Sequence, residues 1–203
     1  MIFRPVHYRP LFARVLTGVV TLLGAIAVGG LVLQGSWLEI ARYAPVTLLV
    51  VALCWALFWL PDLRIEEHAV TVRNILRTHH IPWPAIERID TKYALTLYTR
   101  ERAIPVWVAP APSRSRARDA TLGEARNVPE SAKAAEGSVR PGDLPSTESG
   151  AAALIIRRHW EQLRDDGVFD RITTPQRIRT EWNLPIAILL GGLLVATVAG
   201  LSL

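Results

Sequence analysis

Three long runs without a charged residue constrain this 203-residue chain more than any other feature. They cover residues 15–33, 44–60 and 185–203. At a rise of 1.5 Å per residue the first run forms a helix of about 28 Å, close to the ~30 Å hydrocarbon core of a bilayer. A soluble core can bury one such run, but three runs in a chain of this size predict three transmembrane helices.

Proline and tryptophan accompany the ends of the second and third runs. Pro45 and Pro185 are expected in the first turns of their helices, where the missing N–H costs nothing. Trp55 and Trp59 close the second run and Trp182 precedes the third, as expected of an aromatic belt. These residues therefore mark the predicted helix ends at the membrane interface.

The first run has a second interpretation, a cleaved signal peptide. A basic segment precedes it, and Ala25-Ile26-Ala27 imitates a cleavage signature. However, the run is longer than the usual apolar region of a signal peptide, and a second run follows within about ten residues. We therefore expect residues 1–61 to keep both runs as a transmembrane hairpin.

The placement of arginine predicts the orientation in the membrane. Residues 1–14 carry three arginines and no acid, whereas the connector at 34–43 carries only Glu39 and Arg42. Arginines also lie near both ends of residues 62–184. The positive-inside rule then places the N-terminus and residues 62–184 in the cytoplasm, and the connector and C-terminus outside. The prediction is a multi-pass protein of the cell (inner) membrane.

The formal charge of +5 suggests nucleic acid, but its distribution argues against that partner. Acidic residues nearly balance the basic ones in residues 62–184, so the excess comes mostly from the N-terminal segment. We therefore expect no nucleic-acid partner. The single cysteine, Cys54, rules out an internal disulfide bond.

Residues 62–109 alternate apolar and polar positions and predict about five short strands in an antiparallel meander. Segments such as Leu63-Arg64-Ile65 and Val70-Thr71-Val72 carry this alternation. Ile81-Pro82-Trp83-Pro84 interrupts it, since neither proline can donate to a sheet. So short a sheet buries little core alone and needs a cover.

Residues 110–150 are rich in Pro, Ser, Ala, Gly, Arg and Glu, which predicts a disordered insert. Arg114, Arg116 and Arg118 cluster at its start. Two interpretations stay open for this cluster. It is either a solvated linker or a segment that touches anionic lipid, at about 1 kcal/mol per arginine near the surface.

Residues 151–167 predict an amphipathic helix, with Ile156, Trp160 and Leu163 on one face. Ser149 is the expected N-cap and Gly167 the residue after the C-terminus, while Arg157 is expected on another face. The helix either covers the small sheet, as we expect, or lies on the membrane. Residues 168–184 connect it to the third span.

These features resemble a known family. The residues that carry the resemblance are Phe3-Arg4-Pro5, Leu63-Arg64-Ile65, Val70-Thr71-Val72-Arg73-Asn74 and Ile81-Pro82-Trp83 with Ile86. They are similar to the small actinobacterial membrane proteins with a pleckstrin-homology (PH) domain, of the low-molecular-weight protein antigen type. The resemblance implies a bacterial PH-like domain, a meander closed by a C-terminal helix. The expected fold is thus three transmembrane helices plus a small α+β PH-like domain.

No pattern of catalytic residues emerges. His79 and His80 are adjacent, so on a strand they point to opposite faces and cannot easily chelate one ion with His68. No nucleophile motif or phosphate-binding glycine loop is present, and no charged residue lies within a predicted span. We expect no enzyme activity, no metal and no cofactor.

Three groups of residues are candidate binding positions. Gly192, Ala196 and Gly200 repeat every four residues, either as ordinary small residues of a membrane helix or as a packing face. Trp83 and Trp107 are candidates for a partner patch. The candidate contacts for anionic lipid headgroups are Arg73, Arg77, Arg114, Arg116 and Arg118.

The function expected from these features is that of a scaffold or accessory subunit. A cytoplasmic PH-like module, held at the membrane by the spans, recognises a protein partner without catalysis. The alternative is a sensor of anionic lipid headgroups at the inner leaflet. Salt distinguishes the two, because binding to a charged lipid surface falls steeply with ionic strength.

Overall fold

The structure is a computed structural model that describes residues 6–8, 11–110, 144, 147–170 and 176–202. Contacts divide the chain into two units. The first comprises Met1–Tyr8, Asp62–Arg73 and His79–Thr180, and the second comprises Arg9–Pro61, Asn74–Thr78 and Glu181–Leu203. Most of the strands belong to the first unit, and the long apolar helices belong to the second.

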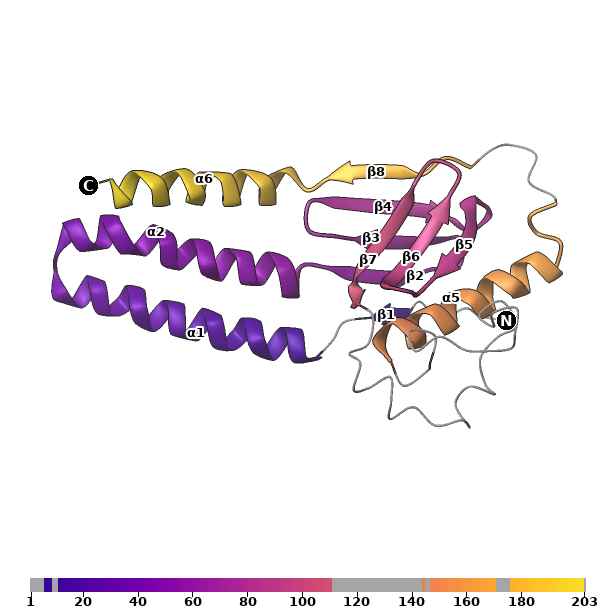
Figure 1. The fold of residues 1–203 in the computed structure, drawn as a ribbon, viewed down its shortest axis with the longest axis horizontal. Coiled ribbons are helices and arrows are strands. Elements are labelled where there is room, and N and C mark those ends of the chain that lie inside the picture. Colours follow the sequence, from indigo (N-terminus) through magenta and orange to yellow (C-terminus); the bar gives the residue numbers. More distant parts are fainter. Residues whose placement is uncertain (1–5, 9–10, 111–143, 145–146, 171–175, 203) are drawn as a thin grey trace. The chain divides into compact units, whose positions relative to one another are not determined.

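Within the described part of the chain, three helices are long and apolar enough to cross a membrane. They are α1 (Leu11–Gln34), α2 (Trp37–Cys54) with its π-helical continuation η1 (Trp55–Trp59), and α6 (Leu184–Leu201). α1 and α2 form an antiparallel hairpin, and α6 lies beside α2 (Figure 1). As predicted, Pro185 lies in the first turn of α6.

The connector between α1 and α2 is much shorter than predicted. Gly35 adopts a φ of +71°, and Ser36 caps α2 by accepting a hydrogen bond from the backbone N–H of Glu39 (3.4 Å). Residues 37–43 are therefore helical, and Pro45 lies inside α2 rather than in its first turn. The predicted helix start at residue 44 is therefore wrong. Glu39 and Arg42 interrupt the apolar run of the sequence, but the helix continues through both.

Pro45 leaves a gap in the hydrogen bonding of α2, and α6 packs against that gap. Because proline has no N–H, the carbonyl of Ala41 receives no bond from the residue four positions later. A Cβ placed on Gly200 of α6 would collide with this carbonyl oxygen. Glycine thus permits the close approach of α6 to the open turn of α2.

The strands form two antiparallel sheets. The five-stranded sheet has the order β1-β2-β3-β4-β8, and the three-stranded sheet has the order β5-β6-β7. The strands of the first sheet are β1 (Val6–Tyr8), β2 (Asp62–Ile65), β3 (Ala69–Arg73), β4 (Arg77–Pro82) and β8 (Arg179–Trp182). Those of the second are β5 (Ile86–Asp90), β6 (Ala94–Thr99) and β7 (Ala103–Pro110).

Two strands of the five-stranded sheet come from outside the predicted meander. β1 precedes α1 and pairs with β2, with Val6 opposite Ile65. β8 precedes α6 and lies at the β4 edge. Between β4 and β5, Trp83–Ala85 forms a short 3-10 turn, η2, where the two prolines predicted an interruption.

Helix α5 (Glu148–Asp165) begins earlier than predicted. Thr147, not Ser149, is the N-cap, and its hydroxyl accepts a hydrogen bond from the N–H of Gly150 (3.0 Å). Gly167 adopts a φ of +65° after the helix, as its predicted role requires. The predicted insert at 110–150 therefore overlaps α5 at one end and β7 at the other. Its residues 111–143 and 145–146 lie outside the described residues.

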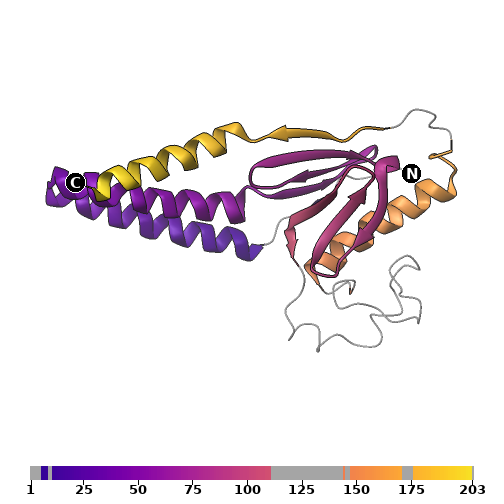
Figure 2. The ribbon, with the colours of Figure 1, turned by 45° about the horizontal axis from the view of Figure 1, so that its top comes forward.

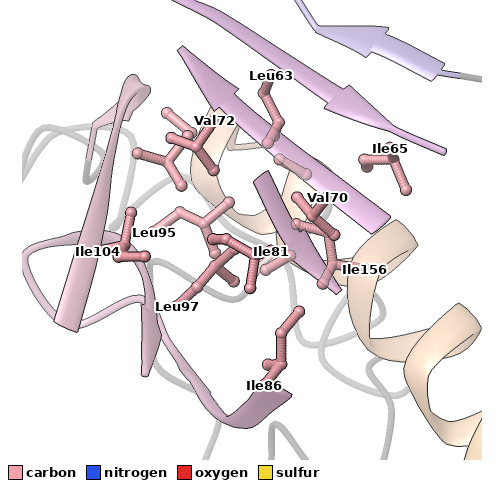
Figure 3. Close-up of a cluster of buried hydrophobic side chains, with 14 of the residues drawn as sticks. Leu63, Ile65, Val70, Val72, Ile81, Ile86, Leu95, Leu97, Ile104 and Ile156 are labelled. Carbon is pink, nitrogen blue, oxygen red and sulfur yellow. The ribbon is translucent and has the colours of Figure 1, made fainter. Parts of the chain in front are cut away.

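The core of the first unit lies between the two sheets and α5, which runs beside the three-stranded sheet in both ribbon views (Figure 2). Alternate positions of the strands point inward, so both sheets contribute (Figure 3). α5 contributes Ala152, Ala153 and Ile156, which are fully buried. This confirms that the amphipathic helix covers the sheet. The buried branched residues include Leu63, Ile65, Val70, Val72, Ile81, Leu95, Leu97 and Ile104.

Candidate interaction surface

The three-stranded sheet has one face in the core and one face directed outward. Leu97 and Ile104 are opposite each other and buried, whereas Thr96 and Pro105 form the next pair and point the other way. Trp107 follows Pro105 on the outward side of β7 and is 53% exposed. We call this surface the outer face and define it by Arg88, Thr96, Tyr98, Pro105 and Trp107.

Arg88 gives the outer face a fixed charge. Its guanidinium carbon lies 4.0 Å above the ring of Tyr98, its partner on the neighbouring strand. Such stacking orders the arginine while leaving its edge N–H groups available to a ligand. The outer face thus combines an exposed indole, a proline and an ordered cation.

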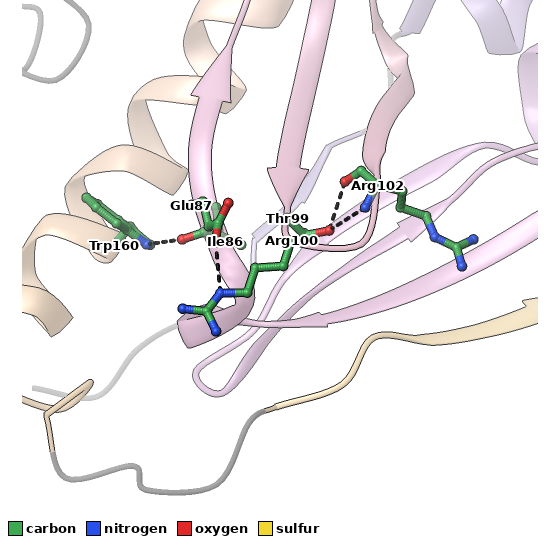
Figure 4. Close-up of polar contacts among 6 residues, drawn as sticks. All are labelled: Ile86, Glu87, Thr99, Arg100, Arg102 and Trp160. Atoms are coloured by element: carbon green, nitrogen blue, oxygen red, sulfur yellow. Dashed lines mark hydrogen bonds and ion pairs between the residues drawn. The ribbon is translucent and has the colours of Figure 1, made fainter.

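An open pocket of about 240 Å³ lies between β5 and α5. The Nη2 atom of Arg157 donates to the carbonyl of Ile89 (3.1 Å). The indole N–H of Trp160 donates to the carbonyl of Ile86 (3.1 Å), and Figure 4 shows this second bond. β5 is an edge strand, and these two bonds engage two of its carbonyls. α5 therefore closes the edge against the addition of another strand.

The side chain of Thr99 stabilises the turn between β6 and β7 (Figure 4). The Thr99 hydroxyl donates to the carbonyl of Arg102 (2.8 Å) and accepts from its N–H (3.2 Å). Beside it, Arg100 forms an exposed ion pair with Glu87 of β5 (3.1 Å). These contacts fix the end of the outer face at which Tyr98 lies.

Of the residues predicted to bind lipid headgroups, only Arg73 and Arg77 lie within the described residues. Arg73 ends β3 in the first unit and is half-buried. Arg77 belongs to the second unit, where its guanidinium carbon lies 4.0 Å above the ring of Trp182. Arg114, Arg116 and Arg118 lie outside the described residues.

The two tryptophans predicted as a partner patch have different environments. Trp107 is exposed, as the prediction requires. Trp83 is only 2% exposed, and its indole N–H donates to the carbonyl of Glu66 (3.1 Å). Trp83 is thus a core residue and does not contribute to a surface patch, because η2 turns its ring inward against the ring of His159 at 4.8 Å.

The predicted packing face of the third span is also divided. Gly200 is buried against α2, whereas Gly192 and Ala196 are exposed and a Cβ on Gly192 would meet nothing within 4 Å. The buried positions of α6 are Ile186, Thr197 and Gly200. The face that contacts α2 therefore follows the helical period through these residues and not the four-residue repeat of small residues.

The adjacent histidines contact different strands, as their alternation predicts. The Nδ1 atom of His79 lies 3.0 Å from the Thr180 hydroxyl on β8, and that of His80 lies 3.0 Å from the Thr71 hydroxyl on β3. Each ring therefore connects β4 to one of its two neighbours.

Two structural residues were missed or misplaced by the sequence interpretation. Arg157 was expected on a polar face but is 3% exposed. It lies one turn after Ala153, so a helical wheel places it within the apolar stripe. Asn183, the N-cap residue of α6, bonds to the turn between β3 and β4. No local pattern signals a contact over such a separation.

A comparison with known protein families gives a match to part of the chain. Residues 60–142, less than half of the chain, match the family model of a bacterial PH domain. The matched range includes every strand from β2 to β7 and ends before α5. Searches of curated proteins and of solved structures returned no match. The family match, the two antiparallel sheets and the covering helix together support a PH-like domain in the first unit of this chain.

Proposed function

We propose that this chain is an integral membrane protein whose PH-like unit acts as a scaffold or accessory subunit for a protein partner, without catalysis. Helices α1, α2 with η1, and α6 are its spans. The N-terminus and residues 62–184 are cytoplasmic, and the C-terminus is outside. The observation that carries the binding role is the outer face, with its exposed Trp107.

The strands that adjoin the three helices support one feature of this topology, namely which helix ends share a side of the membrane. Two residues separate β1 from α1, β2 begins just after η1, and β8 leads into α6. All three strands belong to one sheet, and a sheet cannot be divided across a bilayer. The three adjoining helix ends therefore belong on one side, which agrees with the side that the arginine distribution assigns to the cytoplasm.

The composition of the outer face favours a protein partner. Exposed tryptophan, tyrosine and arginine are the residues that most often dominate the binding energy of protein interfaces. The sheet beneath them is closed by a full core, so these side chains are presented on a rigid base. The lipid-sensing alternative draws on Arg73, Arg77, Arg114, Arg116 and Arg118, of which only the first two lie within the described residues.

The proposal can be tested with a photo-reactive phenylalanine analogue placed at position 107 of the full chain in native membranes. We expect cross-linking to one protein of constant mass, and loss of that adduct when Pro105→Glu is added. The matched control carries the analogue at Tyr93, which is 79% exposed in the turn between β5 and β6. Tyr93 should not give the adduct.

The outcomes separate the two functions. Lipid adducts in place of a protein adduct at position 107 would support the headgroup sensor. An adduct of equal yield at positions 107 and 93 would show non-specific proximity and contradict the proposal. Extraction of the chain by alkaline carbonate would contradict the proposed membrane insertion, independently of the cross-linking result.

A further inference from the structure

The turn of the β3–β4 hairpin belongs to the second unit, which contains the long apolar helices and is called the helical unit below. The rest of the hairpin belongs to the first, PH-like unit. Residues 74–78 are grouped by their contacts with the helices. Ile75 packs against a buried cluster made of Ala56, Leu60 and Ile186. One end of the helical unit therefore includes a piece of β-turn in addition to the ends of α1, η1 and α6.

Asn183 fixes this turn to the start of α6. Its backbone N–H donates to the carbonyl of Leu76 (2.9 Å). Its side-chain Nδ2 donates to the carbonyls of Asn74 (3.0 Å) and Ile75 (3.1 Å). Its Oδ1 accepts from the Thr78 hydroxyl (3.1 Å). The turn is therefore held at the level of the first turn of α6.

Two arginine–tryptophan pairs lie at the same end of the unit. Arg77 stacks on Trp182 at 4.0 Å, and Arg14 of α1 lies 5.7 Å from the ring of Trp59. Both tryptophans are partly exposed, at 56% for Trp182 and 43% for Trp59. Within the described residues no carboxylate forms an ion pair with either arginine.

This combination has the chemistry of a lipid headgroup site. Tryptophan prefers the boundary between headgroups and acyl chains, and an arginine stacked on a ring keeps its edge donors for a phosphate oxygen. Leu76, which directly precedes Arg77 in the turn, is 42% exposed. An exposed leucine beside arginine fits the interfacial layer, where apolar and phosphate groups are both within reach.

We propose that Arg14, Trp59, Leu76, Arg77 and Trp182 form an interfacial clamp that binds the phosphates of anionic phospholipids in the bilayer around the helices. Leu76 enters the acyl boundary, and the two arginines bind phosphate oxygens. The proposal rests on the membrane insertion included in the proposed function. It differs from headgroup sensing, because the clamp belongs to the spans and anchors them at a fixed depth.

The depth of Leu76 gives the first test. In the full chain with Cys54→Ser, Leu76→Cys is labelled with an environment-sensitive fluorophore and placed in proteoliposomes. We expect quenching by lipids that carry a nitroxide near the headgroup. Tyr93→Cys, labelled in the same way, should be quenched only by a water-soluble quencher. If the label at Leu76→Cys is quenched only by the water-soluble quencher, as expected for the label at Tyr93→Cys, the clamp is wrong.

The charge requirement gives the second test. The melting temperature of the full chain is compared in discs of phosphatidylcholine and in discs in which phosphatidylglycerol replaces half of it. We expect a rise of roughly 4 °C, sensitive to salt, that falls by at least half in Arg14→Gln/Arg77→Gln. Arg158→Gln, an exposed arginine on α5, is the control and should keep the full rise.

Three results would overturn the clamp. They are an unchanged rise in the double variant, an equal loss in Arg158→Gln, and reproduction of the rise by inorganic phosphate in phosphatidylcholine discs. The last result would identify a site for soluble phosphate. Alkaline extraction of the wild-type chain reports separately on insertion, and the adduct at position 107 reports on the partner, so failure of the clamp is distinguishable from failure of the proposed function.

Discussion

The side-chain amide of Asn183 donates a hydrogen bond to the carbonyl of Ile75, 108 residues earlier in the chain. The same nitrogen also reaches the carbonyl of Asn74, so one residue at the start of α6 satisfies two carbonyls of a distant turn. Buried or half-buried carbonyls of a turn need such partners, because water does not reach them fully. Asn183 thus stabilises the β3–β4 turn, although the two are far apart in the sequence.

Replacing Asn183 should destabilise the helical unit. Asn183→Ala removes two donors and one acceptor, at about 1 kcal/mol for each hydrogen bond, so we expect a loss of about 3 kcal/mol. Thr78→Val removes only the bond to Oδ1 and should cost about 1 kcal/mol. Unfolding of the full chain in detergent measures both. Equal stability of Asn183→Ala and wild type would contradict the support role.

Enlarging Gly200 should separate α6 from α2. A Cβ at this position collides with the carbonyl of Ala41, so we expect Gly200→Val to lower stability by about 2 kcal/mol. Gly192→Val is the matched control, because a Cβ there meets nothing within 4 Å. Thermal unfolding in detergent distinguishes the two variants, and an equal effect of both would refute the packing that we describe.

Removing the buried guanidinium of Arg157 should destabilise the PH-like unit. Arg157→Ala leaves the carbonyl of Ile89 without this donor and opens space beside the core, for an expected loss of about 3 kcal/mol. Arg158→Ala removes an exposed arginine from the next position and should change stability by less than about 0.5 kcal/mol. Hydrogen exchange of β5 in the full chain provides the measurement, with faster exchange expected only for Arg157→Ala.

The N-cap of α5 can be assigned by substitution. Thr147→Ala removes the acceptor of the Gly150 N–H and should cost about 1 kcal/mol. Thr147→Ser keeps the hydroxyl and should retain most of the stability. Exchange rates of the first amides of α5 report directly on this end of the helix. If the serine variant loses as much protection as the alanine variant, the hydroxyl is not the cap.

The sequence predicted best those elements whose residues are close together in the chain. The apolar runs led to α1, α2 and α6, and the spacing of Ile156 and Trp160 led to α5 as the cover of the sheet. Pro82 and Pro84 correctly indicated the break after β4. Each of these predictions depends on periodicity or on the covalent chemistry of proline, which act locally.

The sequence predicted poorly whatever depends on a distant partner. β1 and β8 are too short to show alternation, and only pairing with β2 and β4 makes them strands. Pro45 was expected at a helix start because local rules place it there, whereas it lies inside α2, and Gly200 of α6 approaches the carbonyl that it leaves without a donor. Trp83 illustrates the same limit at the candidate site, since only the fold shows which of two similar tryptophans is buried.

The placement of β1 and β8 on the two sides of the central strands sets an order of assembly. In a chain inserted as we propose, β8 is the last of the described strands to be synthesised, so the edge of β4 stays unpaired until Thr180 has emerged from the ribosome. A chain whose first span inserts in the reverse direction leaves β1 on the wrong side and the edge of β2 exposed as well. Exposed strand edges attract other chains, and quality control acts on such species. In the proposed orientation, the five-stranded sheet is completed only when both α1 and α6 cross the membrane in the correct direction.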